Sequence, residues 1–142
     1  MKIGRWILLA LVLGGAGFFA WRYYRGKKVE TIATPVFAPN ARAPQGVRIK
    51  VEVLNATNTK GLARKATTYL RDRGFDVVEV GTSREQRDKT LVLDRSHHPS
   101  WAGLVAAAFG AEVQEKPDSL RFIDLTVLVG ADWRPPPLPF YP

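Results

Sequence analysis

The pattern of hydrophobic and polar positions becomes regular after residue 46. From Val47 to Val53 every second residue is valine or isoleucine and the residues between them are charged, which is typical of a half-buried strand. A turn over residues 55–59 leads into a helix whose apolar positions recur at helical spacing: Leu62, Ala66, Tyr69 and Leu70. We expect Asn58 or Thr59 to cap the start of this helix and Gly74 to end it in a left-handed conformation.

Four more strands and a second helix follow. The strands are predicted at Phe75–Val80, Thr90–Asp94, Glu112–Glu115 and Phe122–Val129. The third of these is polar, which suits a sheet edge, whereas the last is apolar enough for the interior of a sheet. The second helix begins at Pro99, ends at Gly110 and carries one apolar stripe: Trp101, Leu104, Val105, Ala108 and Phe109.

This order of elements, β-α-β-β-α-β-β, predicts the α/β (α+β) fold class. Two helices that each carry one apolar face can bury both faces on the same side of a sheet. We therefore predict a two-layer sandwich with two helices on one face of a four- or five-stranded mixed sheet, similar to the ferredoxin-like plan.

The first 28 residues are predicted to form an N-terminal membrane anchor with basic flanks. Residues 6–21 contain no charged side chain, and as a helix they would be about 24 Å long, shorter than a hydrocarbon core of about 30 Å. Tryptophan and tyrosine near its ends, with arginines that can snorkel outward, let this segment form a single transmembrane helix. A cleaved signal peptide, with Gly15 and Gly17 near the cleavage site, is the main alternative.

Two proline-rich segments flank the domain that is predicted at residues 47–133. Residues 29–46 are rich in proline and alanine and lack helical or strand periodicity, so we expect an extended linker that holds the domain away from the bilayer. Residues 134–142 are predicted to be an unstructured Pro-rich tail, because such a sequence needs no partner to stay extended.

The charge distribution assigns most of the basicity to the membrane flank. The 142 residues carry a net charge of +8, but residues 1–46 hold seven Lys and Arg side chains against Glu30 alone, which leaves only +2 for residues 47–142. We therefore expect no nucleic acid as a partner. More basic residues follow the span than precede it, so the positive-inside rule mildly favours a cytoplasmic domain. The absence of cysteine excludes disulfides and a thiol nucleophile.

The residues that most resemble a metal or catalytic site lie around the connection between the third strand and the second helix. His97 and His98 are the only histidines, and adjacent side chains on an extended segment point in opposite directions, so we predict neither a metal nor a cofactor. Asp94, His97 and Ser100 lie in a loop without the Gly-x-Ser-x-Gly motif of a nucleophile elbow. A small hydrolase or transferase that uses these three residues is kept as an alternative.

Basic residues on the first helix, together with the turn before it, are the candidates for binding. Arg64 and Arg71 are a heptad apart, so part of this charge shares one helix face. The turn leads into a helix N-terminus, where free N–H groups carry a partial positive charge. The candidate residues for binding an anionic polymer are Asn55, Thr57, Lys60, Arg64, Lys65 and Arg71. A solvated helix face and a capped turn are the alternative interpretation.

Short motifs along the predicted domain resemble the C-terminal domain of the LytR family of cell-envelope proteins. The similar segments are Val51-Glu-Val-Leu-Asn-Ala-Thr57, Gly61-Leu-Ala63, Gly74-Phe-Asp-Val77 and Ile123–Trp133. They occur in the order and at the separation found in the family, and the resemblance covers residues 47–133. Ala56 departs from the family pattern, which commonly has Gly in an Asn-Gly-Thr turn at this place.

The resemblance implies a location in the cell envelope, outside the cytoplasmic membrane, and we prefer it to the charge count as a guide to orientation. It implies no enzyme, because in the larger LytR-CpsA-Psr proteins a separate catalytic domain transfers glycopolymers to peptidoglycan. The sequence therefore predicts a non-catalytic, single-pass protein of the cytoplasmic membrane. We expect its extracytoplasmic domain to bind peptidoglycan, an anionic cell-wall glycopolymer or an envelope protein. A cytoplasm-facing regulator is the alternative.

Overall fold

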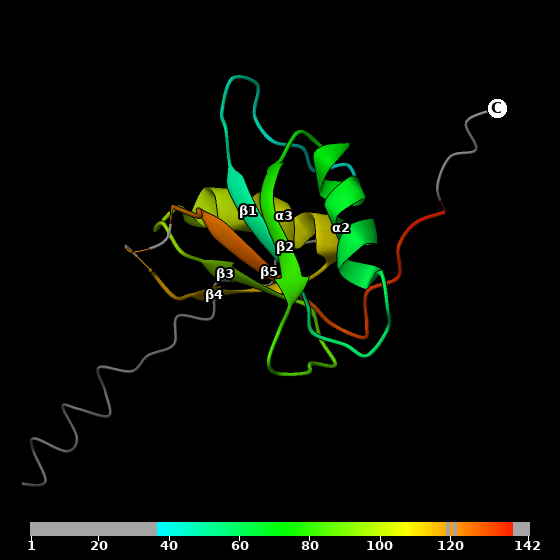
Figure 1. Ribbon diagram of the computed structural model, residues 1–142. Helices are drawn as coiled ribbons and strands as arrows, with labels where there is room; N and C mark the ends of the chain where they lie inside the picture. Colours follow the sequence, from blue (N-terminus) through cyan, green and yellow to red (C-terminus); the bar gives the residue numbers. More distant parts are fainter. Residues whose placement is uncertain (1–36, 119, 121, 138–142) are drawn as a thin grey trace, which may run out of the picture. The chain divides into compact units, whose positions relative to one another are not determined.

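The computed structural model describes residues 37–118, 120 and 122–137 of the chain. The expected membrane span at residues 6–21 and the linker before residue 37 lie outside these residues. Among the described helices, none is long and apolar enough to cross a membrane. In chain order the described elements are β1 (Lys50–Asn55), α2 (Leu62–Arg71), β2 (Asp76–Thr82), β3 (Leu91–Asp94), α3 (Pro99–Phe109), β4 (Glu112–Glu115) and β5 (Leu125–Val129) (Figure 1).

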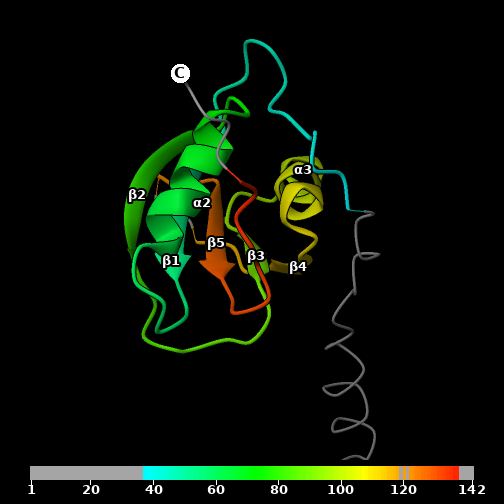
Figure 2. The ribbon, with the colours of Figure 1, turned by 90° about the vertical axis from the view of Figure 1, so that its right-hand side faces the viewer.

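The five strands form one mixed sheet in the order β2-β1-β5-β3-β4. β1 pairs in parallel with both β2 and β5, whereas β3 is antiparallel to β5 and parallel to β4. Both helices lie in front of the same face of this sheet in Figure 2, and their apolar side chains join a single core. The predicted arrangement of two helices on one face of a mixed sheet is confirmed, with five strands, β5 in the interior and β4 at an edge. The expected likeness to the ferredoxin-like plan is wrong, because the two strands of each β-α-β unit are direct neighbours and are not separated by another strand.

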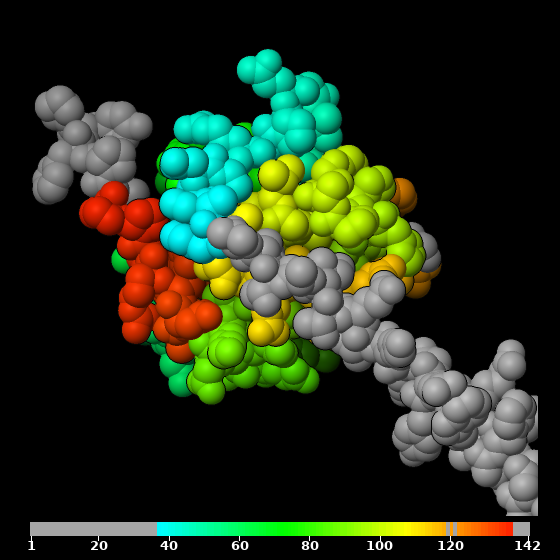
Figure 3. Space-filling view, turned by 180° about the vertical axis from the view of Figure 1, so that it is seen from behind, coloured from blue at the N-terminus to red at the C-terminus, as the bar shows by residue number. Residues whose placement is uncertain are grey.

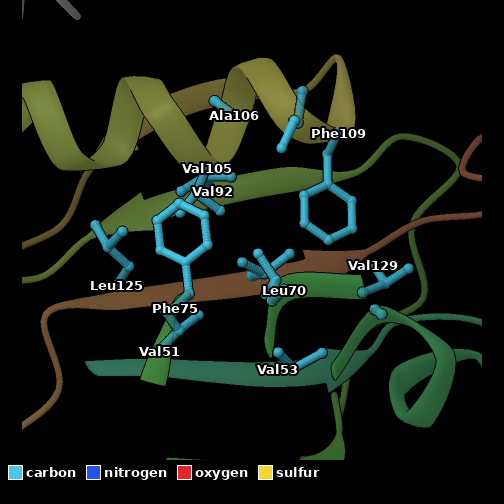
Figure 4. Packing of buried hydrophobic residues seen from close by; sticks show 14 of the residues in the cluster. Val51, Val53, Leu70, Phe75, Val92, Val105, Ala106, Phe109, Leu125 and Val129 are labelled. Atoms are coloured by element: carbon cyan, nitrogen blue, oxygen red, sulfur yellow. The ribbon is translucent and has the colours of Figure 1, made fainter. Parts of the chain in front are cut away.

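The core lies between the sheet and the two helices. In Figure 4 the side chains of Val105 and Phe109 on α3 point down toward the sheet, which contributes Val51 and Leu125, and Leu70 of α2 joins the same cluster. Four of these five side chains are fully buried, and Phe109 is 7 % exposed. Alternate positions of β1 and β5 thus face the helices, which is the periodicity that predicted these strands.

α2 begins later than its sequence signals indicated. The residue before its first turn is Gly61, with φ of 79°, and no side chain caps the helix, so the expected cap by Asn58 or Thr59 is wrong. The reason is local, because Asn55 Nδ2 donates to the carbonyl oxygen of Thr59 at 2.8 Å and keeps the chain in the turn. The left-handed conformation that then leads into the helix is one that glycine adopts without strain.

Two strands are shorter than predicted. β1 starts at Lys50, and Val47, which was expected within it, is 37 % exposed. β5 starts at Leu125, and Phe122, expected inside the sheet, is 87 % exposed. Asp124 terminates the pairing, because its Oδ2 accepts the N–H of Lys50 at 2.8 Å while its own N–H donates to the Lys50 carbonyl oxygen. A side chain therefore takes the place of the ladder that a longer strand would have made.

Residues 37–46, which we name the strap, lie against the domain. The N–H of Ala38 donates to the carbonyl oxygen of Ala107 in α3, and the N–H of Ala43 donates to that of Arg73 after α2, both at 2.9 Å. Figure 2 shows the strap running from the end of α2 across to α3. This part of the segment differs from the expected free linker, because it finds hydrogen-bond partners at the C-terminal ends of both helices.

Candidate functional site

The exposed start of α2 carries much of the positive charge that the sequence indicated for this helix. Lys60, Arg64 and Lys65 are exposed there, and we name these three residues the basic helix start. The first turn contains no acidic residue, and no side chain caps it. The N–H groups of the first turn therefore add their partial positive charge to that of the three side chains. This end of α2 favours anions.

The amphipathic pattern of α2 explains the exposure of these residues. The buried positions of the helix are Leu62, Ala63, Ala66, Thr67, Tyr69 and Leu70. They face the sheet and α3, so the positions between them face away from the core. Arg64 and Lys65 occupy such positions directly after the first two buried residues.

Asn55 and Thr57 shape the loop before α2. Asn55 Oδ1 accepts hydrogen bonds from the N–H and the hydroxyl of Thr57 at 3.0 and 2.8 Å. Thr57 Oγ1 in turn accepts the N–H of Thr59 at 3.1 Å. The polar groups of both candidates are thus engaged within the loop, as the capped-turn interpretation requires.

Arg71 lies at the other end of α2. Seven residues separate it from Arg64, which corresponds to about 10 Å along a helix axis. Its Nη2 atom donates to the carbonyl oxygen of Val77 at 3.0 Å, so the guanidinium is held against β2. The structure therefore separates Arg71 from the basic helix start.

Asp94 stabilises the connection between β3 and α3. The residue is 1 % exposed, and its Oδ1 atom accepts the N–H groups of Ser96 and His98, both at 3.1 Å. These bonds fix the turn that precedes α3 and give the buried carboxylate a structural role. Ser100 is exposed in the first turn of α3, and no hydrogen bond of the described residues joins it to Asp94.

The two histidines have separate partners. His97 Nδ1 lies 2.5 Å from Glu115 Oε1, on the neighbouring edge strand. His98 stacks on Trp101, with ring centroids 3.9 Å apart and an angle of 7° between the ring planes. Within the described residues no group of three or more His, Asp or Glu side chains is placed to hold a metal ion.

A pocket with a volume of about 270 Å³ lies at the C-terminal ends of both helices. The sequence analysis did not predict it. The Tyr69 hydroxyl, beside it, donates to the carbonyl oxygen of Ala108 at 2.7 Å. Burial raises the pKa of this hydroxyl above its usual 10.0, against a smaller opposing effect of the Arg73 cation. Helical spacing marks Tyr69 as a core residue, but no local signal shows that the strap and the residues after β5 form the walls. We name this concave site the aromatic pocket. Its defining residues are Phe37, Tyr69, Phe109, Asp132, Trp133 and Arg134.

The described domain is thus a small two-layer α/β module with a cationic surface at one end of α2 and an aromatic pocket at the other. A family model described as LytR cell envelope-related transcriptional attenuator matches residues 48–133, and the chain therefore belongs to the LytR_C family. This confirms the resemblance found in the sequence. LytR_C domains are cell-envelope domains of a non-catalytic family.

One solved structure similar to the chain is the soluble domain of a conserved hypothetical secreted protein from Mycobacterium marinum. The two chains are 18 % identical, the match covers 68 % of each, and the TM-score is 0.47. No curated protein matches the chain.

Proposed function

We propose that this chain is a non-catalytic, membrane-anchored module of the cell envelope that binds an anionic cell-wall glycopolymer. Residues 6–21 cross the cytoplasmic membrane once, and the domain of residues 47–133 lies outside that membrane. Membership of LytR_C supports the envelope location and the absence of catalysis. The anchor is supported by the apolar run and its aromatic and basic flanks.

The observation that carries the binding function is the convergence of positive charge at the basic helix start. Three exposed cations and the uncapped first turn of α2 face solvent without an acidic side chain in that turn. A polymer with repeated phosphate or carboxylate groups can approach all of them from one side. Each cation contributes about 1 kcal/mol of binding free energy near an anionic surface. Physiological salt screens this attraction beyond about 8 Å.

Retention of the full-length chain on cell-wall sacculi that carry their anionic glycopolymer tests this binding. Reversal of the charges by Lys60→Glu, Arg64→Glu and Lys65→Glu together should weaken retention by at least about tenfold at physiological salt. The control is Arg84→Glu, Lys89→Glu and Lys116→Glu, three exposed positions away from α2 with the same change in net charge. The control should keep the retention of the unaltered chain.

Two outcomes would contradict the binding function. Equal losses in both triple variants would mean that only overall charge matters and that α2 has no special role. Retention that changes neither with salt concentration nor with the substitutions at the basic helix start would exclude an anionic ligand. An envelope protein would then become the partner to test.

Reporter fusions after Trp133 test the orientation. Alkaline phosphatase folds and becomes active outside the cytoplasm, so an active fusion in a bacterial host is the expected result. Fluorescence from a reporter that matures only in the cytoplasm, with an inactive phosphatase, would show that the positive-inside count is right and would overturn the envelope function.

A further inference from the structure

The floor of the aromatic pocket is a rigid group of three rings. The ring centroids of Tyr69, Phe109 and Trp133 lie 5.2 to 5.7 Å apart. Each of these side chains is no more than 7 % exposed, so packing holds the rings in place. The walls come from the strap and from the residues after β5. Figure 3 shows the strap, in cyan, next to residues 132–137, in red, on the side of the molecule that also exposes α3.

Trp133 carries a hydrogen-bond donor that no described residue accepts. Its residue is 6 % exposed, yet no hydrogen bond of the described residues involves the indole Nε1. In the described part of the chain no side-chain nitrogen or oxygen that is sealed from solvent lacks a partner, so Nε1 is open to solvent. Trp133 lines the aromatic pocket, and its N–H can only donate. A ligand that reaches Nε1 must therefore supply an acceptor oxygen.

The cation nearest to the floor, Arg73, is already engaged. Its Nε and Nη2 atoms donate to the carbonyl oxygen of Pro39 at 2.9 and 2.8 Å, and Nη1 donates to that of Tyr69 at 2.9 Å. The guanidinium carbon also lies 3.5 Å from the centroid of the Tyr69 ring. A phosphate or carboxylate would have to compete with all of these contacts, so the floor favours a neutral group.

Two main-chain groups beside the pocket are engaged as well. The N–H of Ala38 donates to Ala107, and the carbonyl oxygen of Ala108 accepts from Tyr69. An extended peptide is held by a row of free main-chain donors and acceptors, and these positions do not supply one. A ligand must therefore be recognised by side chains.

The rim of the pocket supplies a hydrogen-bond acceptor, hydrogen-bond donors and an aromatic ring. Asp132 Oδ1 accepts the N–H and the hydroxyl of Thr90 at 2.8 Å, while no hydrogen bond of the described residues engages Oδ2. Arg134 donates through Nη1 to the carbonyl oxygen of Ala131 at 2.8 Å, and its other nitrogens stay available in the described structure. The side chain of Phe37 is 60 % exposed. The rim can therefore accept from a ligand, donate to it and pack against its apolar face.

We propose that the aromatic pocket binds one ring of a neutral saccharide. A sugar ring combines an apolar C–H face with hydroxyl groups that both donate and accept hydrogen bonds. Trp133 donates to one ring substituent, Asp132 accepts from a hydroxyl, and Phe37 packs on the C–H face. The volume of about 270 Å³ lies just below the range of roughly 300 to 1,000 Å³ for ligand pockets, which suits a single ring.

This site is separate from the one on which the proposed function depends. The aromatic pocket contains Tyr69 near the end of α2, whereas the basic helix start contains Arg64 in its first turn. Charge reversal at the helix start leaves every pocket residue unchanged. Loss of polymer retention and loss of saccharide binding can therefore be observed independently.

Saturation-transfer NMR on the full-length chain in lipid nanodiscs tests the proposal. The probes are four neutral tetrasaccharides: chitotetraose, cellotetraose, maltotetraose and mannotetraose. At least one should give a saturable signal at millimolar concentration. Asp132→Asn should weaken that binding by about fivefold, because the amide oxygen still accepts from Thr90 but the carboxylate acceptor is lost. Trp133→Phe keeps a ring but removes the N–H, and the loss should be similar.

The matched control is Trp101→Phe, which removes an indole from α3 outside the pocket and should leave saccharide binding unchanged. Circular dichroism checks that each variant is folded, and Asp132→Asn gives the answer if Trp133→Phe is not. The proposal is overturned if none of the four probes binds saturably, or if binding is the same in both pocket variants. It is also overturned if a tetra-alanine peptide binds in their place and loses binding in Trp133→Phe, since the pocket would then be a peptide site.

Discussion

The segments β1-α2-β2 and β3-α3-β4 are two examples of one structure, a parallel pair of strands joined by a helix. In both, the helix packs on the same face of the sheet, and β5 lies between the two pairs (Figure 2). The pairs run in opposite directions, because β5 is parallel to β1 and antiparallel to β3. The comparison between them shows which features the fold requires and which are free to carry a function.

The two helices differ in how they meet solvent. α2 places charged residues such as Arg64 and Lys65 between its buried positions, whereas Pro99–Phe109 contains no charged residue at all. The less buried positions of α3 are small or apolar, and the strap covers its end through the bond from Ala38 to Ala107. The apolar outer side of α3 is therefore partly covered by the strap, while α2 can present an ionic surface to a partner.

The helix starts differ in the same sense. Neither helix has a side-chain hydrogen bond to its first turn, but the N–H groups of Ser96 and His98 before α3 are held by the buried carboxylate of Asp94, whereas α2 follows Gly61 in a left-handed conformation. The bonds to Asp94 add to the stability of the turn before α3, whereas at the start of α2 exposed cations lie beside the free N–H groups and favour an anion. The first half of the fold thus carries the candidate binding surface, and the second half is built for stability.

The largest expected effect comes from the core that both helices share. Leu70 of α2 is fully buried, and Leu70→Ala should lower the free energy of unfolding by about 3 kcal/mol through lost burial and the cavity left behind. Val105→Ala, at a fully buried position of α3, should cost about 2 kcal/mol, because fewer carbon atoms are removed. Urea denaturation followed by circular dichroism measures both. Thr68→Ala, on the exposed face of α2, is the control and should change stability by less than about 0.5 kcal/mol.

The next effect concerns the helix starts. Asp94→Ala leaves two N–H groups without their acceptor and should cost about 2 kcal/mol of unfolding free energy. Gly61→Ala forces a side chain into a left-handed conformation and should cost about 1 kcal/mol. The same denaturation experiment ranks the two. A smaller cost for Asp94→Ala than for Gly61→Ala would mean that the start of α3 does not depend on its carboxylate.

The elements that could be predicted from the sequence are those in which the spacing of apolar residues matches the spacing of the buried positions. The alternation before Asn55 identified β1, and the spacing from Leu62 to Leu70 identified α2, because each pattern follows from one side facing the core. The apolar run of α3 identified a helix, but its predicted stripe is only partly right. Val105, Ala108 and Phe109 are buried as expected, whereas Trp101 and Leu104 are only partly buried and Ala102 and Ala106 are buried as well, because an uncharged helix gives no polar face from which to fix the stripe.

The features that sequence reasoning missed depend on residues far apart in the chain. The start of β5 is set by Asp124, whose partner Lys50 is 74 positions away. At Gly130 a Cβ atom would lie 2.3 Å from the backbone of Lys89, an approach that no local pattern reveals. The charges of the candidate site could be read directly, but the internal bonds of Asn55 and the contact of Arg71 with Val77 could not.

Tyr69 connects the two halves and gives a pH-dependent prediction. Its hydroxyl donates from α2 to Ala108 of α3, so Tyr69→Phe should cost about 1 kcal/mol at neutral pH. Burial raises the pKa of Tyr69 above 10.0, so above that pH the unfolded chain loses the proton first and the folded state is destabilised as pH rises toward the folded-state pKa. Denaturation at increasing alkaline pH should show this loss in the unaltered chain and a smaller loss in Tyr69→Phe. An identical alkaline loss in both would assign the effect to other groups.

The smallest expected effect separates two arginines of α2 that sequence analysis grouped together. Arg71→Ala removes the hydrogen bond to Val77 and should lower the free energy of unfolding by about 0.5 kcal/mol, whereas Arg64→Ala should leave it within about 0.3 kcal/mol. The order should reverse for retention on sacculi, where Arg64→Ala weakens binding more, because Arg64 belongs to the basic helix start and Arg71 is held against β2. Equal effects on retention would mean that the polymer contacts the whole length of α2, and the uncapped first turn would lose its special role.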